Sequence, residues 1–141
     1  MKRAAGAIIE TNNGEVLLQL RDENTNKYPL KVSIFGGGVE EGETIIEALY
    51  RELEEELHLS RDMIVSVELL GEYNYDNITI VTVHIIRISV GKEDLTLGEG
   101  KEIVAITNVV EAIRELDFAF NIKEVLTDYY NKKKIGLENE K

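Results

Sequence analysis

The segment from Ile78 to Val90 constrains the fold most, because it is apolar on both faces of any strand that it could form. Its two parities are both apolar, with Ile78, Ile80, Ile86 and Ile88 on one and Val81, Val83 and Ile85 on the other. A strand of this kind normally lies inside a sheet that is covered on both sides. The segment therefore predicts a sheet with helices packed on each face.

Shorter segments supply the other strands and the helices. Alternating or apolar stretches predict strands over 4–10, 15–21, 63–70 and 101–107, and helical spacing predicts helices over 44–57, 108–115 and 121–133. Asn13-Gly14, between the first two strands, is typical of a hairpin turn. Gly36-Gly37-Gly38 is expected to interrupt regular structure. The order of elements predicts an α/β fold, an α/β/α sandwich around a mixed β-sheet.

The composition argues against several classes of protein. A chain of 141 residues fits one domain over 1–141, and it holds no apolar run of about 18 residues that could form a transmembrane helix. The first residues lack the features of a signal peptide, and the absence of cysteine fits a reducing compartment. A net charge of −11 at neutral pH disfavours binding to a nucleic-acid duplex. We therefore expect a cytoplasmic protein with neither a nucleic-acid nor a membrane partner.

The acidic charge is concentrated in one stretch of the chain. Residues 40–56 contain eight glutamates and a single basic residue, Arg51. On the predicted helix, Glu52, Glu55 and Glu56 share an arc of about 100° beside the apolar stripe. Like charges at this spacing destabilise a bare helix, whereas a divalent cation would reverse that effect. Ligands that are all oxygens favour Mg²⁺ or Mn²⁺ over zinc. The alternative interpretation is a solvated, charged helix face.

The residues that precede this helix favour the metal site. Gly36, Gly37 and Gly38 allow the backbone to approach a ligand closely. Glu43 stands at the expected helix start, where the helix dipole favours a carboxylate. Glu43, Glu47 and Arg51 then follow one another at four-residue steps along one side of the helix.

Residues 37–59 resemble the signature of the Nudix hydrolases. That signature is a glycine, five residues, a glutamate, seven residues, and then Arg-Glu-aliphatic-any-Glu-Glu-any-Gly-aliphatic. Here it reads Gly37, Glu43, Arg51, Glu52, Leu53, Glu55, Glu56, His58 and Leu59. His58 replaces the usual glycine. A glycine just past a helix end commonly adopts the left-handed conformation, and histidine is one of the few other residues that tolerates it, so we expect His58 to cap the helix.

The resemblance implies a reaction and the residues that serve it. Nudix hydrolases cleave a nucleoside diphosphate that is linked to another group, with the help of divalent ions, here expected to be Mg²⁺ or Mn²⁺. One of the signature glutamates, or a glutamate from another loop, would activate the attacking water. The resemblance assigns the metal to Glu52, Glu55, Glu56 and the Gly37 carbonyl, and assigns to Arg51 the holding of these glutamates.

A further acid is expected from the segment before the last strand. Glu99 and Glu102 are the candidates, and Glu102 is favoured because it abuts the apolar run from Ile103 to Ile106. We therefore place Glu102 with the catalytic and metal-binding residues. The alternative is that both are solvent-exposed acids of a loop.

Other residues are candidates for binding the substrate. Arg21, at the end of a strand, could meet a phosphate, and Phe35 would lie beside the ligand with Gly36, Gly37 and Gly38. Tyr75 falls where the family places substrate-selecting residues, and a tyrosine near that position resembles the dinucleoside-polyphosphate hydrolases. Arg21 could equally be a surface residue, and Tyr75 an ordinary strand aromatic.

The short chain and the resemblance together predict hydrolysis of a nucleoside triphosphate to the monophosphate and pyrophosphate. The alternatives are hydrolysis of a dinucleoside polyphosphate or a nucleotide sugar, and a Nudix module that senses a nucleotide without cleaving it. Such a module would be expected to lose signature glutamates, and this chain keeps them all. Because dimers are common in the family, a homodimer is one expected state.

Overall fold

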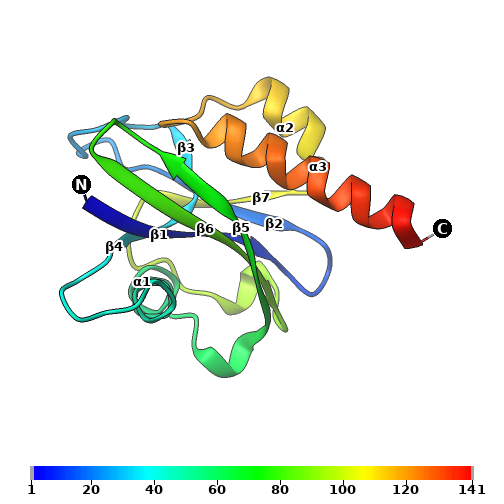
Figure 1. The fold of residues 1–141 in the computed structure, drawn as a ribbon, viewed down its shortest axis with the longest axis horizontal. Coiled ribbons are helices and arrows are strands. Elements are labelled where there is room, and N and C mark those ends of the chain that lie inside the picture. Colours follow the sequence, from blue (N-terminus) through cyan, green and yellow to red (C-terminus); the bar gives the residue numbers. More distant parts are fainter. Residues whose placement is uncertain (1, 141) are drawn as a thin grey trace.

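A mixed seven-stranded sheet forms the middle of the molecule, and helices cover both of its faces (Figure 1). The computed structural model describes residues 2–140. The strands are β1 (Lys2–Glu10), β2 (Val16–Leu20), β3 (Val32–Ser33), β4 (Phe35–Gly38), β5 (Ile64–Asn74), β6 (Thr79–Ile88) and β7 (Glu102–Ile106). The helices are α1 (Ile45–Leu57), α2 (Val109–Glu115) and α3 (Ile122–Glu140), with short 3-10 turns at Arg61–Met63 and Lys92–Asp94. The predicted α/β/α sandwich around a mixed sheet is confirmed.

Strand β1 is the hub of the sheet, whose main order is β3-β2-β1-β6-β5. It pairs in parallel with β6 along its whole length, from Lys2 opposite Thr79 to Glu10 opposite Arg87. Its other edge is shared by two antiparallel strands, β4 at the N-terminal end and β2 at the C-terminal end. Strand β7 pairs with β2. This arrangement brings the end of β2, the glycines of β4 and the loop before β7 to the same region of the sheet.

One face of the sheet packs against α1. The apolar stripe that the sequence predicts is buried here, because Leu49, Leu53 and Leu57 are fully inaccessible to solvent. They contact the side chains that β1, β2 and β6 direct to the same face, among them Leu17 and Ile86. This cluster holds α1 firmly against the sheet, so that the opposite side of the helix is free to carry charge.

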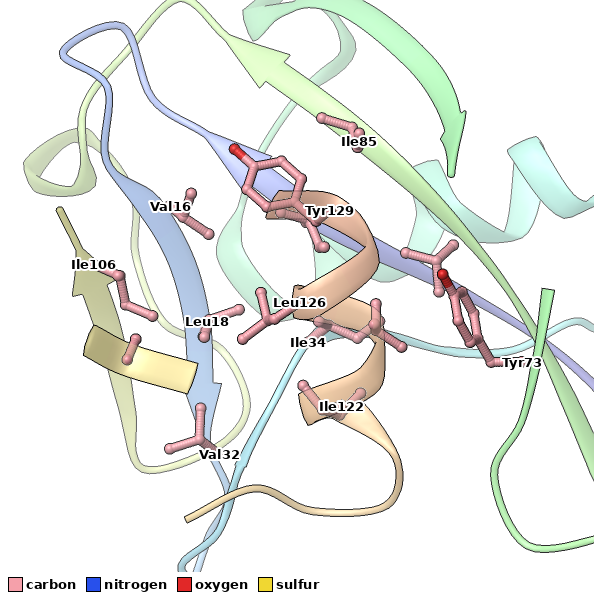
Figure 2. Close-up of a cluster of buried hydrophobic side chains, with 14 of the residues drawn as sticks. Val16, Leu18, Val32, Ile34, Tyr73, Ile85, Ile106, Ile122, Leu126 and Tyr129 are labelled. Atoms are coloured by element: carbon pink, nitrogen blue, oxygen red, sulfur yellow. The ribbon is translucent and has the colours of Figure 1, made fainter. Parts of the chain in front are cut away.

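The other face packs against α2 and α3. Figure 2 shows Ile122, Leu126 and Tyr129 on α3 pointing toward the sheet, where Leu18 and Ile85 come up from β2 and β6. Leu126 is fully buried and Tyr129 is 5% exposed. The predicted doubly covered strand is thereby confirmed in β6, because Val81, Val83 and Ile85 join this cluster while Ile86 and Ile88 join the one under α1.

Local hydrogen bonds fix both ends of α1. Thr44 caps the N-terminus by accepting from the N–H of Glu47, whose side chain accepts in return from the N–H of Thr44. His58 ends the helix in the left-handed conformation, with φ 53° and ψ 34°, and its N–H donates to the carbonyl of Glu54. The cap predicted for His58 is therefore confirmed. No helix within residues 2–140 combines the length and apolar character needed to cross a bilayer.

The glycine-rich segment differs from its prediction. Gly36, Gly37 and Gly38 do not interrupt regular structure but belong to β4, paired with Gly6, Ala5 and Ala4 of β1. The reason is steric, because a Cβ on Gly36, which has φ 143°, would lie 2.0 Å from the carbonyl oxygen of Ala5. Only glycine permits this close pairing of the two strands. The glycines thus allow β4 to pair with β1, and they leave the edge of β4 beside α1.

Candidate functional site

Glu56 is the most deeply placed carboxylate at this end of the sheet. It is 3% exposed, and it accepts hydrogen bonds from the N–H of Gly36 at 2.7 Å and from the side-chain amide of Gln19 at 3.2 Å. Burial raises the pKa of Glu56 to about 8, and the charges of Glu52 and Glu99 act in the same direction against these two hydrogen bonds. A cation beside Glu56 would therefore be strongly favoured.

Arg51 holds the signature glutamates together. Its Nε and Nη2 donate to the two carboxylate oxygens of Glu43 at 2.8 and 2.9 Å. Its Nη1 donates to Glu52 at 2.9 Å and lies 3.5 Å from Glu55, and its Nη2 also reaches the carbonyl of Gly38 at 2.9 Å. The paired guanidinium lowers the pKa of Glu43 to about 2. In this arrangement Arg51 contacts Glu52 and Glu55 and is itself held by Glu43, which is the geometry that its expected role requires.

Glu52 lies directly against the backbone of Gly37. A Cβ on Gly37 would fall 2.5–2.7 Å from the atoms of the Glu52 carboxylate, so any larger residue would displace it. Burial raises the pKa of Glu52, with the hydrogen bond from Arg51 opposing this and the charges of Glu55 and Glu99 reinforcing it. Glu55 is more open, with 55% of its side chain exposed. The three glutamates that share an arc of the predicted helix thus differ in solvent exposure, from buried Glu56 to exposed Glu55.

The structure brings Glu99, and not Glu102, to these glutamates. Glu99 shares the central cavity with Glu56, and its charge acts on both Glu52 and Glu56. Glu102 starts β7 opposite Leu20 and lines a separate hollow with Glu15 and Lys92. The preference for Glu102 is therefore corrected, because the segment before β7 turns between the two residues and directs them to different hollows.

A cavity of about 170 Å³ links the carboxylates to an aromatic wall. Its lining includes Glu56, Glu99, Gly36 and Gly37 together with Tyr75 and Phe120. The Tyr75 and Phe120 rings are stacked, with centroids 4.4 Å apart and planes 16° apart. Tyr75 was expected here from the sequence, whereas Phe120 was not, because its segment carries no periodic pattern.

Two other predicted binding residues, Arg21 and Phe35, make contacts within the protein. Arg21 lines the cavity, but its Nε donates to the carbonyl of Lys27 and its Nη2 to the hydroxyl of Thr25, both at 3.0 Å, so it secures the loop over 22–31. Phe35 forms part of the inner wall and is fully buried against the α1 side of the core. Gly38 is exposed and gives its carbonyl to Arg51.

The chemistry of these donors fits a hard divalent cation. Glu52, Glu55, Glu56, Glu99 and the Gly37 carbonyl offer only oxygen, which suits Mg²⁺ or Mn²⁺. The close fit of Glu52 on Gly37 places a carboxylate beside the backbone of β4. Among residues 2–140, no three acidic or histidine side chains are already gathered around one point as ligands. Instead, Arg51 engages Glu52 and Glu55, and Glu56 accepts from the N–H of Gly36.

Comparison with known proteins decides the family. The family model of the NUDIX domain matches residues 1–129, nearly the whole chain. This chain belongs to the Nudix family. A Nudix hydrolase of Nostoc sp., itself uncharacterized, is 36% identical over 90 residues, which are 61% of this chain and 53% of that protein. The chain therefore spans about half the length of this curated relative.

Solved structures share the Nudix fold at low sequence identity. A MutT protein from Methanosarcina mazei Go1 superposes with a TM-score of 0.77 at 21% identity, covering 94% of this chain and 95% of that one. An Ap4A hydrolase from C. elegans, solved as a binary complex, gives a TM-score of 0.71 at 21% identity over 95% of this chain and 98% of its own. At this sequence identity, the similarity to these structures is evidence for a shared fold alone.

Proposed function

We propose that this chain, as one Nudix domain over 1–141, hydrolyses a nucleoside triphosphate to the monophosphate and pyrophosphate. The observation that carries the proposal is the cavity that Glu56 of α1 and Glu99 line together with Tyr75 and Phe120. An aromatic wall suits a nucleobase, and a cluster of carboxylates with a cation suits a polyphosphate. One cavity lined by both kinds of group therefore suits a nucleotide.

The reaction needs a bond to form and a bond to break at one phosphorus. The oxygen of water adds to one of the two phosphorus atoms of the α–β bridge, the bond from that phosphorus to the bridging oxygen breaks, and the monophosphate and pyrophosphate separate. The proton of the water passes to a carboxylate of the cavity. Glu56 and Glu99 border that space, and Gly36 and Gln19 fix the orientation of Glu56.

Glu52, Glu55, Glu56 and the Gly37 carbonyl would hold Mg²⁺ or Mn²⁺, with Glu99 in place of Glu102 as the further acid. When bound, the ion supplies charge neutralisation and polarises the phosphoryl oxygens. Arg51 keeps Glu52 and Glu55 in place and is itself fixed by both oxygens of Glu43. Apart from the ion, the proposed site thus consists of carboxylates of this chain and the residues that orient them.

The second candidate is hydrolysis of a dinucleoside polyphosphate. The presence of Tyr75 in the cavity and the likeness in fold to an Ap4A hydrolase support it. Nucleotide-sugar hydrolysis and a sensing role without cleavage remain outcomes of the test below.

The test is a hydrolysis screen with Mg²⁺ that identifies the products by chromatography. It covers nucleoside triphosphates, including those with oxidised bases, nucleotide sugars, ADP-ribose and dinucleoside polyphosphates. We expect monophosphate and pyrophosphate from a triphosphate, and a loss of at least about 100-fold in kcat for Glu56→Gln. Binding of metal and nucleotide without any turnover would identify a sensing module instead.

A matched pair of variants tests the choice between the two loop acids. We expect Glu99→Gln to lower kcat about 10-fold or more, and Glu102→Gln to leave it within two-fold, because only Glu99 borders the cavity. Equal losses in both variants would contradict the placement of the site.

Two further expectations accompany the proposed activity. We propose the cytoplasm as the place of the reaction, because a cysteine-free sequence fits a reducing compartment. A homodimer is the proposed assembly, and sedimentation of the purified protein tests it.

A further inference from the structure

Gln19 joins three parts of the candidate site through one side chain. It lies on β2, is 6% exposed, and its Nε2 donates to Oε2 of Glu56 on α1 at 3.2 Å and to the carbonyl of Glu99 at 3.1 Å. We propose that Gln19 is a positioning residue that sets the place of the Glu99 loop relative to Glu56. This inference rests on the proposed function and names a residue that the signature does not include.

The Gln19 side chain can be buried because its amide group has these two hydrogen-bond acceptors. The preceding residues of β2, Val16, Leu17 and Leu18, are apolar and buried, so an amide at the next position is the one polar side chain within a core strand. A buried amide without partners is costly, and the amide group of Gln19 finds its acceptors in Glu56 and Glu99. The contacts that make this side chain tolerable in the core are therefore the contacts that reach the site.

The loop that carries Glu99 is shaped to meet both α1 and Gln19. The N–H of Gly98 donates to the carbonyl of Glu56 at 2.7 Å, and a Cβ on Gly98 would lie 2.2 Å from the carbonyl oxygen of Glu55. Gly100 has φ 97°, and a Cβ there would lie 2.8 Å from Nε2 of Gln19. Glycine on each side of Glu99 thus lets the backbone press against the helix and against the amide at the same time.

Gln19 therefore acts through other residues and touches no reacting atom. On one side it directs an oxygen of Glu56, and on the other it holds the backbone of Glu99, whose side chain remains exposed. Losing the amide would free the loop on the side that faces β2, although Gly98 would still attach it to α1. Glu56 and Glu99 would then no longer keep a fixed separation.

The variant Gln19→Met tests the proposal, because methionine keeps the length of the side chain and lacks the amide. In metal-free protein, we expect faster hydrogen exchange of the amides over 98–101 and unchanged exchange elsewhere in the sheet. We also expect Mn²⁺ affinity, measured by calorimetry, and kcat to fall about 10-fold, with KM changed by less than about three-fold. Gln19→Leu serves as a second variant, should the first fail to fold.

Leu18→Val provides the matched control on the same strand, because Leu18 is fully buried in the cluster under α2 and α3. It removes buried apolar volume on the face of the sheet away from α1, so it should lower the midpoint of unfolding and leave Mn²⁺ affinity and kcat unchanged. If Gln19→Met behaves like this control, with only its stability lowered, the positioning role is overturned. Wild-type protein that cleaves nothing in the screen, while Gln19→Met still weakens Mn²⁺ binding, would refute the proposed function and support the positioning role.

Discussion

At the scale of single residues, Arg51 explains how so many glutamates share one helix. Its guanidinium donates to Glu43 through Nε and Nη2, to Glu52 through Nη1, and to the Gly38 carbonyl through Nη2 as well. Lysine could not replace it, because an ammonium group lacks the planar fork that binds both oxygens of one carboxylate. Arg51 therefore offsets part of the repulsion that the acidic cluster would otherwise cause in the absence of a cation.

His58 leads to a prediction about stability. It is exposed and holds φ at 53°, a conformation that costs a non-glycine residue about 1 kcal/mol relative to glycine. We expect His58→Gly to raise the free energy of unfolding by about 1 kcal/mol, measured by thermal or chemical denaturation, and to leave turnover intact. His58→Ala is the control and should bring no such gain. A loss of turnover in His58→Gly would show that the imidazole takes part in the reaction.

The sequence predicts those residues of the candidate site that lie together on one helix. Helical periodicity alone places Glu52, Glu55 and Glu56 on one arc, and the structure keeps them there. Gln19 and Phe120 reach the cavity only through sheet pairing and the docking of α3, which a local pattern does not encode. The choice between Glu99 and Glu102 failed for the same reason, because the irregular segment before β7 has no period that would orient either side chain.

At the scale of elements, α3 is attached to the far end of β1 by a buried carboxylate. Glu10 is 9% exposed and accepts hydrogen bonds from the hydroxyl of Tyr129 and from Nζ of Lys133, the latter at 2.8 Å, with Arg87 at 3.5 Å. Burial alone would raise the pKa of Glu10, but the bonds from Lys133 and Tyr129 outweigh it and hold that pKa below its ordinary value of 4.5. The ionised carboxylate is therefore the form that holds α3.

This contact predicts a dependence of stability on pH. Because the pKa of Glu10 is lowered by folding, its contribution is complete above about pH 4.5 and is lost as the pH falls toward its folded value. We expect Glu10→Gln to lower the free energy of unfolding by about 1–3 kcal/mol at pH 7 in urea titrations, with a difference from wild type that shrinks below pH 4.5.

Glu68→Gln is the control for the Glu10 contact. Glu68, on β5, pairs with Lys132, which lies on α3 as Lys133 does. Because 56% of the Glu68 side chain is exposed, loss of this pair should change the free energy of unfolding by less than about 1 kcal/mol. A Glu10→Gln effect that stays constant down to pH 3 would refute the role of the ionised carboxylate.

Element boundaries show what the sequence could and could not predict. The helix over 44–57 is nearly exact because Thr44 and His58 cap it locally. Strand β5 and helix α3 both run several residues beyond their predicted ends, to Asn74 and Glu140. Strand β5 is extended by pairing with β6, as in the pair of Tyr73 with Val81, and that partner is not visible in the local sequence of β5.

At the scale of the whole molecule, the sheet separates two clusters of buried side chains. Leu53 belongs to the cluster under α1, and Leu126 to the cluster under α2 and α3 (Figures 1 and 2). The signature carboxylates lie on α1 and flank Leu53 directly, whereas Tyr75, which lines the same cavity as Glu56, packs against the other cluster. Stability should therefore depend on both clusters, whereas metal binding should depend on one.

Two alanine variants test this separation. Both leucines are fully buried, so Leu53→Ala and Leu126→Ala should each lower the free energy of unfolding by about 2–5 kcal/mol. We expect Mn²⁺ affinity to fall in Leu53→Ala and to stay within two-fold of wild type in Leu126→Ala, as measured by calorimetry at a temperature where both are folded. Equal losses of affinity would show that the two sides of the sheet are coupled.

The parallel pairing of β1 with β6 also has a consequence for synthesis on the ribosome. Strand β1 ends at Glu10, but the partner for its full length is complete only when Ile88 has been added. At about 5–20 residues per second, several seconds pass between these events. Strands β2 and β4 are made sooner, and they occupy the other edge of β1. A nascent chain of this protein therefore carries an open strand edge for seconds, during which a neighbouring nascent chain could pair with it.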